Sequence, residues 1–285
     1  MNSLVIIGSG GRLGAALIHA ATNVVGFSRR DLDLACPTSL EKTLKPLAFD
    51  ALINCAALTN VDYCQTHPDE ARAVNTDAVR RIAEICERKH ARCIHISTDY
   101  VFDGIQRTPY TEVDAACPLS VYGETKRQGE IELLNISPVF LAARVSWIFG
   151  PERPSFIDHI LQCARELKPL QAIGDKWSIP TYTKDLATWL LHLAREKSIG
   201  GVLHLTQTGS ACTWQEYAQH ALDCVGANRT VGFQSLADMQ TFVAPRPVYT
   251  ALDTTQFTAK TGIHPRPWQE AVEEYVRSPR CSSLP

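Results

Sequence analysis

The chain has 285 residues, of which 45% are hydrophobic and 20% are charged, and its formal net charge is −2. Such values are typical of a globular protein with one large domain or two unequal ones. The basic residues are scattered and no apolar run approaches 18 residues, so we expect neither a nucleic-acid partner nor a membrane span.

The ten cysteines include no Cys-x-x-Cys pair and no zinc-ligand spacing. We therefore expect free thiols and no metal site. An apolar, strand-like run follows Met1-Asn2-Ser3 directly, which is not the pattern of a signal peptide. Together these features favour a cytoplasmic protein.

The first strand is predicted at residues 4–7, and a glycine-rich turn follows it. Gly8, Gly11 and Gly14 are spaced by three, and apolar residues at helical spacing come next. Glycines in this place let the backbone turn tightly and approach a diphosphate, whose charge rests on the helix N-terminus. The pattern predicts a dinucleotide site, with these candidate contacts: Gly8, Gly10, Gly11, Arg12 and Leu13.

A second strand is predicted at residues 24–27. Sites for NAD often place an acid at the end of this strand, but here two adjacent arginines occupy it. Two cations favour a 2′-phosphate and hence NADPH as the cofactor. Asp31 and Asp33 follow closely, so NADH stays an alternative cofactor. The candidate contacts at this strand end are Ser28, Arg29 and Arg30, with Asp33 and Leu34 beside the adenine.

Two further strands are predicted at residues 51–57 and 91–97, with a long helix from residue 67 to about residue 89 between them. Thr66 is the expected N-cap of that helix. Asn75 lies inside it, where we expect its side chain to bond neighbouring backbone. His95 is expected to be a packed strand residue and not a catalyst. Small residues at the exit of the first strand allow a flat ligand to approach, so Cys55, Ala56 and Ala57 are candidate cofactor contacts.

Another strand is predicted at residues 139–145, which completes an alternation of strands and helices. This alternation predicts an α/β fold with a doubly wound parallel sheet, the Rossmann type. Beyond Gly150, prolines and glycines separate shorter elements: helices at 182–195 and 214–224, and a strand at 201–205. We expect an NAD(P)-binding domain over 1–150, to which part of 180–210 returns, and a smaller interleaved α/β substrate lobe over 151–285.

The chemistry is predicted to lie between Ser97 and Lys126. Thr98 ends a strand, and Tyr122 and Lys126 are four residues apart, so on a helix they share a face. A free phenol has a pKa near 10, and a neighbouring ammonium can lower that pKa by roughly 1–3. Our hypothesis is that hydride passes from a nicotinamide to a carbonyl carbon while Tyr122 protonates the oxygen. Thr98 would bond that oxygen, Lys126 would tune Tyr122 and hold the nicotinamide ribose, and Ser97 would be a further cofactor contact.

Motifs over nearly the whole chain give the sequence a family resemblance. They are Gly8-x-x-Gly11-x-Leu13-Gly14, Asn54-Cys55-Ala56-Ala57-Leu58-Thr59-x-Val61-Asp62, Ala73-Val74-Asn75, Ser97-Thr98-Asp99-Tyr100-Val101-Phe102-Asp103-Gly104, Pro118-x-x-x-Tyr122-Gly123-x-Thr125-Lys126, Arg144-x-Ser146-Trp147, Pro180-Thr181 and Arg246-Pro247. The chain resembles the extended short-chain dehydrogenase/reductases, and among them the dTDP-4-dehydrorhamnose reductase family.

This resemblance implies reduction of a 4-keto nucleotide-activated deoxysugar with NAD(P)H, in dTDP-rhamnose biosynthesis. It also implies that Thr98 and Asp99 contact the sugar and that Trp147 lines the sugar pocket. Arg246 would bind the substrate diphosphate, with an ion pair as its alternative role.

The chain departs from the family pattern at several positions. The family often has glutamine where Arg12 stands, and it usually has Asp-Gln-x-Gly where this chain has Asp175-Lys176-Trp177-Ser178. Because of these last residues, the resemblance does not identify the sugar or the nucleotide of the substrate. Ala15-Ala16 replaces a metal-linked glutamate of some members, in keeping with no metal.

Two alternative functions are compatible with the same sequence. The first is a nucleotide-sugar epimerase or dehydratase of the same fold, although Asp99-Tyr100 after Thr98 disfavours dehydration. The second is a non-enzymatic regulatory subunit that binds NADP, against which the intact Thr98, Tyr122 and Lys126 argue. Whether the chain forms a homodimer is also left open.

Overall fold

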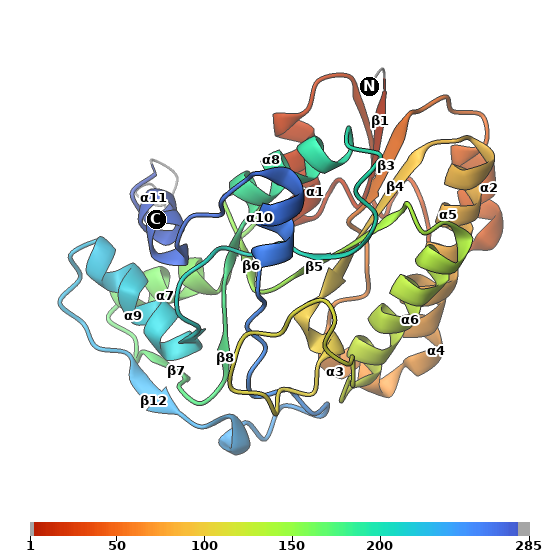
Figure 1. Cartoon of the computed structure of the whole chain (residues 1–285). Coiled ribbons are helices and arrows are strands. Elements are labelled where there is room, and N and C mark those ends of the chain that lie inside the picture. The colour runs from red at the N-terminus through yellow and green to blue at the C-terminus, as the bar shows by residue number, and fades with distance from the viewer. Residues whose placement is uncertain (1–2, 279–285) are drawn as a thin grey trace.

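The computed structural model describes residues 3–278, and its centre is a six-stranded sheet in which every strand pair is parallel (Figure 1). The strand order is β10-β5-β4-β3-β1-β2. The strands are β1 (Leu4–Ile7), β2 (Val24–Phe27), β3 (Ala51–Asn54), β4 (Arg92–Thr98), β5 (Leu141–Val145) and β10 (Gly201–His204). From β1 the chain builds β2 on one side and then crosses to β3 on the other, which opens a crevice at the carboxyl ends of β1 and β3. The predicted doubly wound α/β fold is confirmed.

Alternation along the strands directs side chains to two helical layers. In β1, Leu4 and Ile6 join the cluster under one layer, whereas Val5 and Ile7 join the cluster under the other. The first layer contains α1 (Arg12–Ala20) and α8 (Thr183–Leu193), and the second contains α2 (Pro37–Leu44), α5 (Ala78–Arg88) and α6 (Val121–Ile136). Both faces of the sheet are thus buried, as parallel sheets require.

The helix predicted from residue 67 to about residue 89 is wrong as a single element. The segment forms α3 (Val61–Thr66), α4 (Pro68–Arg72), a π-helical turn (Ala73–Asp77) and then α5. Thr66 ends α3 and caps nothing, since His67 is the residue before α4.

The wide π-helical turn has a packing role. A Cβ added at Gly129 of α6 would lie 2.3 Å from the Asn75 carbonyl oxygen, so the two helices meet backbone to backbone. The Asn75 side chain bonds both backbone groups of Leu58, at 2.8 and 3.0 Å, as its predicted role required.

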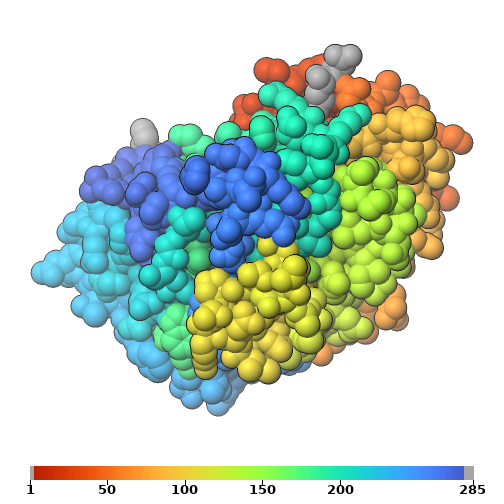
Figure 2. Space-filling view, viewed as in Figure 1, coloured from red at the N-terminus to blue at the C-terminus, as the bar shows by residue number. Residues whose placement is uncertain are grey.

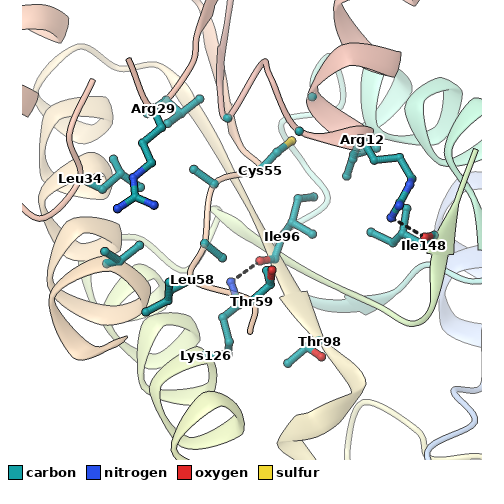
Figure 3. A pocket seen from close by; sticks show the side chains of 18 of the residues that line it. Arg12, Arg29, Leu34, Cys55, Leu58, Thr59, Ile96, Thr98, Lys126 and Ile148 are labelled. Carbon is teal, nitrogen blue, oxygen red and sulfur yellow. Dashed lines mark hydrogen bonds between the residues drawn. The ribbon is translucent and has the colours of Figure 1, made fainter. Parts of the chain in front are cut away.

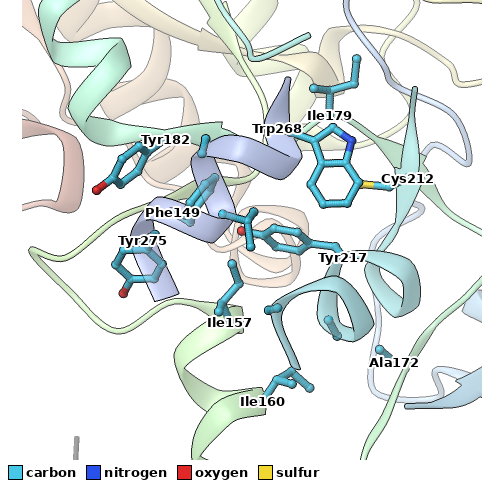
Figure 4. Close-up of a cluster of buried hydrophobic side chains, with 14 of the residues drawn as sticks. Phe149, Ile157, Ile160, Ala172, Ile179, Tyr182, Cys212, Tyr217, Trp268 and Tyr275 are labelled. Carbon is cyan, nitrogen blue, oxygen red and sulfur yellow. The ribbon is translucent and has the colours of Figure 1, made fainter. Parts of the chain in front are cut away.

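A smaller layer lies beside the main sheet and has its own apolar core (Figure 4). Stacked and edge-on aromatic rings fill it, including Phe149, Tyr182 and Tyr217. Its helices are α7 (Phe156–Arg165), α9 (Trp214–Cys224) and α11 (Trp268–Val276). Its short strands pair as β6 (Ile148–Phe149) with β9 (Thr181–Tyr182), β7 (Gln171–Ile173) with β12 (Gly232–Gln234), and β8 (Trp177–Ser178) with β11 (Cys212–Thr213).

Two distant segments are joined across the front of the molecule. In Figure 2 the segment near residues 103–118 (yellow) lies against the segment that includes α10 (Thr255–Thr261, blue). Tyr110 bonds the backbone of Ala251 and Asp253 at 2.8 Å each.

Within residues 3–278 no helix is long and apolar enough to cross a bilayer. The predicted lobe continues past residue 278, outside the described residues.

One buried ion pair fixes α6 to the sheet, and it yields a stability prediction. Arg144 of β5 donates two hydrogen bonds of 2.8 Å to Glu130 of α6, and both side chains are at most 2% exposed. Burial opposes ionisation of Glu130, but the hydrogen bond and charge of Arg144 outweigh it and keep the pKa of Glu130 below its ordinary value.

We expect Glu130→Gln to lower the free energy of unfolding by about 3–5 kcal/mol at pH 7, because it leaves the Arg144 charge buried without its partner. In the wild type this contribution is present above the unfolded-state pKa and is lost as the pH falls through the lowered folded-state pKa. Urea unfolding measures the change, with Glu124→Gln on the exposed side of α6 as the control. Equal stability of the two variants would contradict the assignment.

Candidate active site

A cleft of about 1140 Å³ lies over the carboxyl ends of β1, β3 and β4 (Figure 3). The predicted site residues that line it are Gly8, Gly10, Gly11, Arg12, Leu13, Ser28, Arg29, Arg30, Asp33, Leu34, Cys55, Ala56, Ala57, Ser97, Thr98, Asp99, Tyr122, Lys126 and Trp147. Residues predicted for the cofactor, the chemistry and the sugar therefore share one cavity. Arg246 is the exception, because it does not line the cleft.

The glycine turn fits a dinucleotide because its backbone has no room for side chains. Gly8 has a φ of +85°, and a Cβ there would lie 2.8 Å from the amide nitrogen of Ala56. A Cβ at Gly14 would lie 2.1 Å from the Gly8 carbonyl oxygen. The turn thus packs directly against the exit of β3, and the N-terminus of α1 faces the cleft, where a diphosphate is favoured.

Two arginines flank this turn. Arg12 donates to three carbonyls, those of Ile148, Arg153 and Pro154, and so ties α1 to the start of the smaller layer. The guanidinium nitrogens of Arg12 are therefore used in hydrogen bonds within the protein. Arg153 also lines the cleft, and its guanidinium lies 3.8 Å from where a Cβ on Gly10 would be. No sequence motif points to Arg153, since only the fold brings that turn to the glycines.

The end of β2 presents two exposed cations to the cleft, Arg29 and Arg30. The neighbouring Asp31 does not neutralise them by contact, because it accepts from the Ser28 amide at 2.8 Å and the Ser28 hydroxyl at 2.7 Å. These hydrogen bonds hold the pKa of Asp31 below its usual value. The turn is thereby shaped with both guanidinium groups on the cleft side, an arrangement suited to a phosphate.

Asp99 is buried at the end of β4, beside the part of the cleft where the sequence predicts the sugar, and is surrounded by hydroxyls. It accepts from Thr250 at 2.5 Å, Ser146 at 2.9 Å and Ser178 at 3.3 Å on one oxygen. Thr98 donates to the other oxygen at 3.1 Å and accepts from the Tyr100 amide at 3.2 Å. These bonds fix the end of β4 and hold the Thr98 hydroxyl beside Tyr122.

The pKa of Tyr122 moves in the direction opposite to the one that the Tyr-x-x-x-Lys spacing predicts. Removal of the phenol from water raises its pKa, and a hydrogen bond with Thr98 opposes this only in part. The Lys126 charge is itself disfavoured, because burial lowers the pKa of Lys126 to about 7. The phenol thus remains protonated at neutral pH.

Lys126 contacts a buried residue that the sequence did not assign to the site. Its Nζ lies 2.6 Å from the Ile96 carbonyl oxygen and 2.9 Å from Nε2 of His95, and Nδ1 of His95 lies 3.1 Å from the Asn54 side-chain nitrogen. The Asn54 oxygen accepts from the Ala56 amide, which fixes the orientation of the amide group. Nδ1 must then accept, so Nε2 carries the hydrogen and donates to a neutral Lys126.

Arg246 takes the ion-pair role that was the alternative for it. Its guanidinium bonds Asp62 at 2.6 and 2.9 Å, stacks on the Phe242 ring and is only 8% exposed. The hydrogen bond from Arg246 lowers the pKa of Asp62 to about 2. The pair holds the 242–246 segment near α3, beside the cleft.

Comparison with known proteins agrees with this geometry. The family described as RmlD substrate binding domain matches residues 1–281. The chain belongs to this family.

Similar members and structures cover nearly the whole chain. A dTDP-4-dehydrorhamnose reductase of Aggregatibacter actinomycetemcomitans is 32% identical over 96% of this chain and 98% of its own. A probable dTDP-4,6-dihydroxy-2-methyloxan-3-one 4-ketoreductase of Streptomyces antibioticus is 32% identical, covering 95% of this chain and 93% of its own. The crystal structure of dTDP-4-dehydrorhamnose reductase from Bacillus anthracis in complex with NADP has a TM-score of 0.91 at 25% identity, covering 96% and 99% of the two chains.

Replacing Arg29 and Arg30 together by alanine tests the phosphate site in this RmlD-family chain. We expect NADPH affinity to fall about 10- to 100-fold, because charge-assisted hydrogen bonds to the 2′-phosphate are lost, while NADH affinity stays the same. Titration of cofactor fluorescence measures both. The double variant Arg80→Ala, Arg81→Ala on α5 is the matched control, since this adjacent pair lies outside the cleft. An equal loss for both cofactors would contradict the assignment.

Proposed function

We propose that the chain reduces the 4-keto group of a nucleotide-activated deoxysugar with NADPH, in the manner of a dTDP-4-dehydrorhamnose reductase. The observation that carries the proposal is the meeting of Thr98, Tyr122 and Lys126 in the cleft that the glycine turn opens. The named reductases and ketoreductase among its relatives, and the NADP complex of a similar structure, support the same activity.

Each catalytic side chain has a distinct task in this proposal. The cofactor, when bound, supplies the hydride. Tyr122 donates its proton to the keto oxygen, and its raised pKa suits this direction because the phenol holds its proton at neutral pH. Thr98 bonds the same oxygen and orients it. Lys126 contributes the charge or hydrogen bond that stabilises the phenolate left behind, and it binds the nicotinamide ribose.

We also propose that the smaller layer, with residues 151–278 apart from α8 and β10, holds the sugar. Trp147 lines the cleft where that layer meets the sheet, and its φ of +39° is unusual for an aromatic residue. Asp99 supports this wall through the hydroxyls of Ser146, Ser178 and Thr250. Activity in the cytoplasm fits the free cysteines among the described residues. Homodimer formation stays a prediction.

NADPH oxidation with dTDP-4-keto-6-deoxysugars, dTDP-4-dehydrorhamnose first, tests the activity. In that assay we expect Tyr122→Phe to lower kcat about 10²- to 10⁴-fold, because the proposed proton donor to the keto oxygen is lost, while NADPH binding is nearly unchanged. Tyr182→Phe, which removes a phenol from the core of the smaller layer, is the control. Reduction by Tyr122→Phe at the wild-type rate would refute the mechanism, and no oxidation with any keto sugar would refute the proposed function.

A further inference from the structure

Lys176 is a buried lysine whose Nζ has two aromatic rings as its neighbours and no polar partner among residues 3–278. The residue is 0% exposed, and within residues 3–278 its Nζ has neither a hydrogen-bond partner nor a carboxylate within ion-pair distance. An ammonium taken out of water normally keeps a paired anion or a set of acceptors.

The ammonium lies next to the sugar end of the cleft. Its Nζ is 5.0 Å from the centre of the Tyr100 ring and 5.6 Å from the centre of the Trp147 ring, and both rings line the cleft. The Tyr100 ring in turn meets the Tyr122 ring edge-on at 5.8 Å. The indole nitrogen of Trp147 is a second buried donor without a partner among the described residues. Two unpaired donors therefore flank one wall of the substrate site.

The carboxylates near Lys176 are engaged elsewhere. Asp175 accepts from the Ser235 hydroxyl at 2.6 Å and the Leu236 amide at 2.7 Å. Asp99 is already satisfied by four hydroxyls, and it acts on Lys176 only through its field.

The balance of charge around Lys176 does not favour the ammonium. Burial lowers the pKa of Lys176 to about 8, with the attraction of Asp99 opposing that shift and repulsion by Arg246 adding to it. An uncharged side chain of similar length would therefore suit the folded protein better.

We propose that Lys176 is a specificity-determining residue that binds an oxyanion of the nucleotide-sugar substrate. The oxyanion is the diphosphate, which every nucleoside-diphosphate sugar carries, and Trp147 donates a second hydrogen bond beside it. Lys176 does not itself line the cleft, so a rotation of its four-carbon stem would have to carry Nζ past the Tyr100 ring to reach a ligand there. This inference rests on the proposed function, because it names the chemistry of the substrate that the same cleft accepts.

Lys176→Met in the full-length protein separates this role from a structural one. We expect the variant to be more stable, with a Tm higher by at least about 2 °C, since a buried unpaired charge is removed. We expect its affinity for the anionic ligand to fall about 10- to 100-fold, as for the loss of one charge-assisted hydrogen bond. Lys260→Met on the exposed side of α10 is the matched control and should change neither quantity.

Calorimetric titration with four ligands identifies the oxyanion. If Lys176 binds the diphosphate, Lys176→Met weakens dTDP binding and leaves thymidine binding unchanged. If the variant instead weakens only UDP-glucuronate binding and leaves dTDP and UDP-glucose binding unchanged, the ligand is a sugar carboxylate, which a 6-deoxysugar lacks, and the proposal is overturned. Unchanged affinity for all four ligands, or a loss of stability with no change in affinity, would overturn the proposal. These titrations need no turnover, so they are read independently of whether any keto sugar is reduced.

Discussion

The close contact between α6 and the sheet is the constraint on which the site depends. Glu130 and Lys126 lie one turn apart on the buried face of this helix, and each is bonded to the sheet: Glu130 to Arg144 and Ser97, and Lys126 to the backbone of β4. With both anchored, Tyr122 is held where the helix begins, beside the last residues of β4. Tyr122, the proposed proton donor, is thus positioned by buried polar contacts, which permit little sliding or rotation of the helix.

The same contact also sets the electrostatics of the site. Burial that holds Lys126 in place disfavours its charge and lowers its pKa, while it raises the pKa of Tyr122. The two shifts act together to favour the neutral form of each group, a phenol and an amine. In the proposed reduction, a phenol that keeps its proton at rest is suited to donate it to the keto oxygen.

Much of the site could be predicted because its chemistry is local in sequence. The glycine turn requires glycine at fixed spacing after a strand, and Tyr122 and Lys126 share a face at any helix position four apart. The sign of the Tyr122 pKa shift could not be predicted in this way, because spacing reveals a neighbouring charge but not how much water the fold excludes. Similarly, the π-helical turn that breaks the predicted 67–89 helix depends on the approach of Gly129, a contact across 54 residues.

Residues whose partners lie far away in the sequence are the ones that could not be placed from the sequence. Arg246 carries the motif of a diphosphate ligand but pairs with Asp62, and only the fold brings these two together. The surroundings of the two buried lysines could likewise not be predicted from the sequence. Burial lowers the pKa of both, yet Lys126 is bonded to His95 and the β4 backbone while Lys176 faces only aromatic rings. Stability alone explains neither buried lysine. Under the proposed function, Lys126 serves the bound cofactor and the phenol on the same helix face, and Lys176 serves the substrate that the cleft binds.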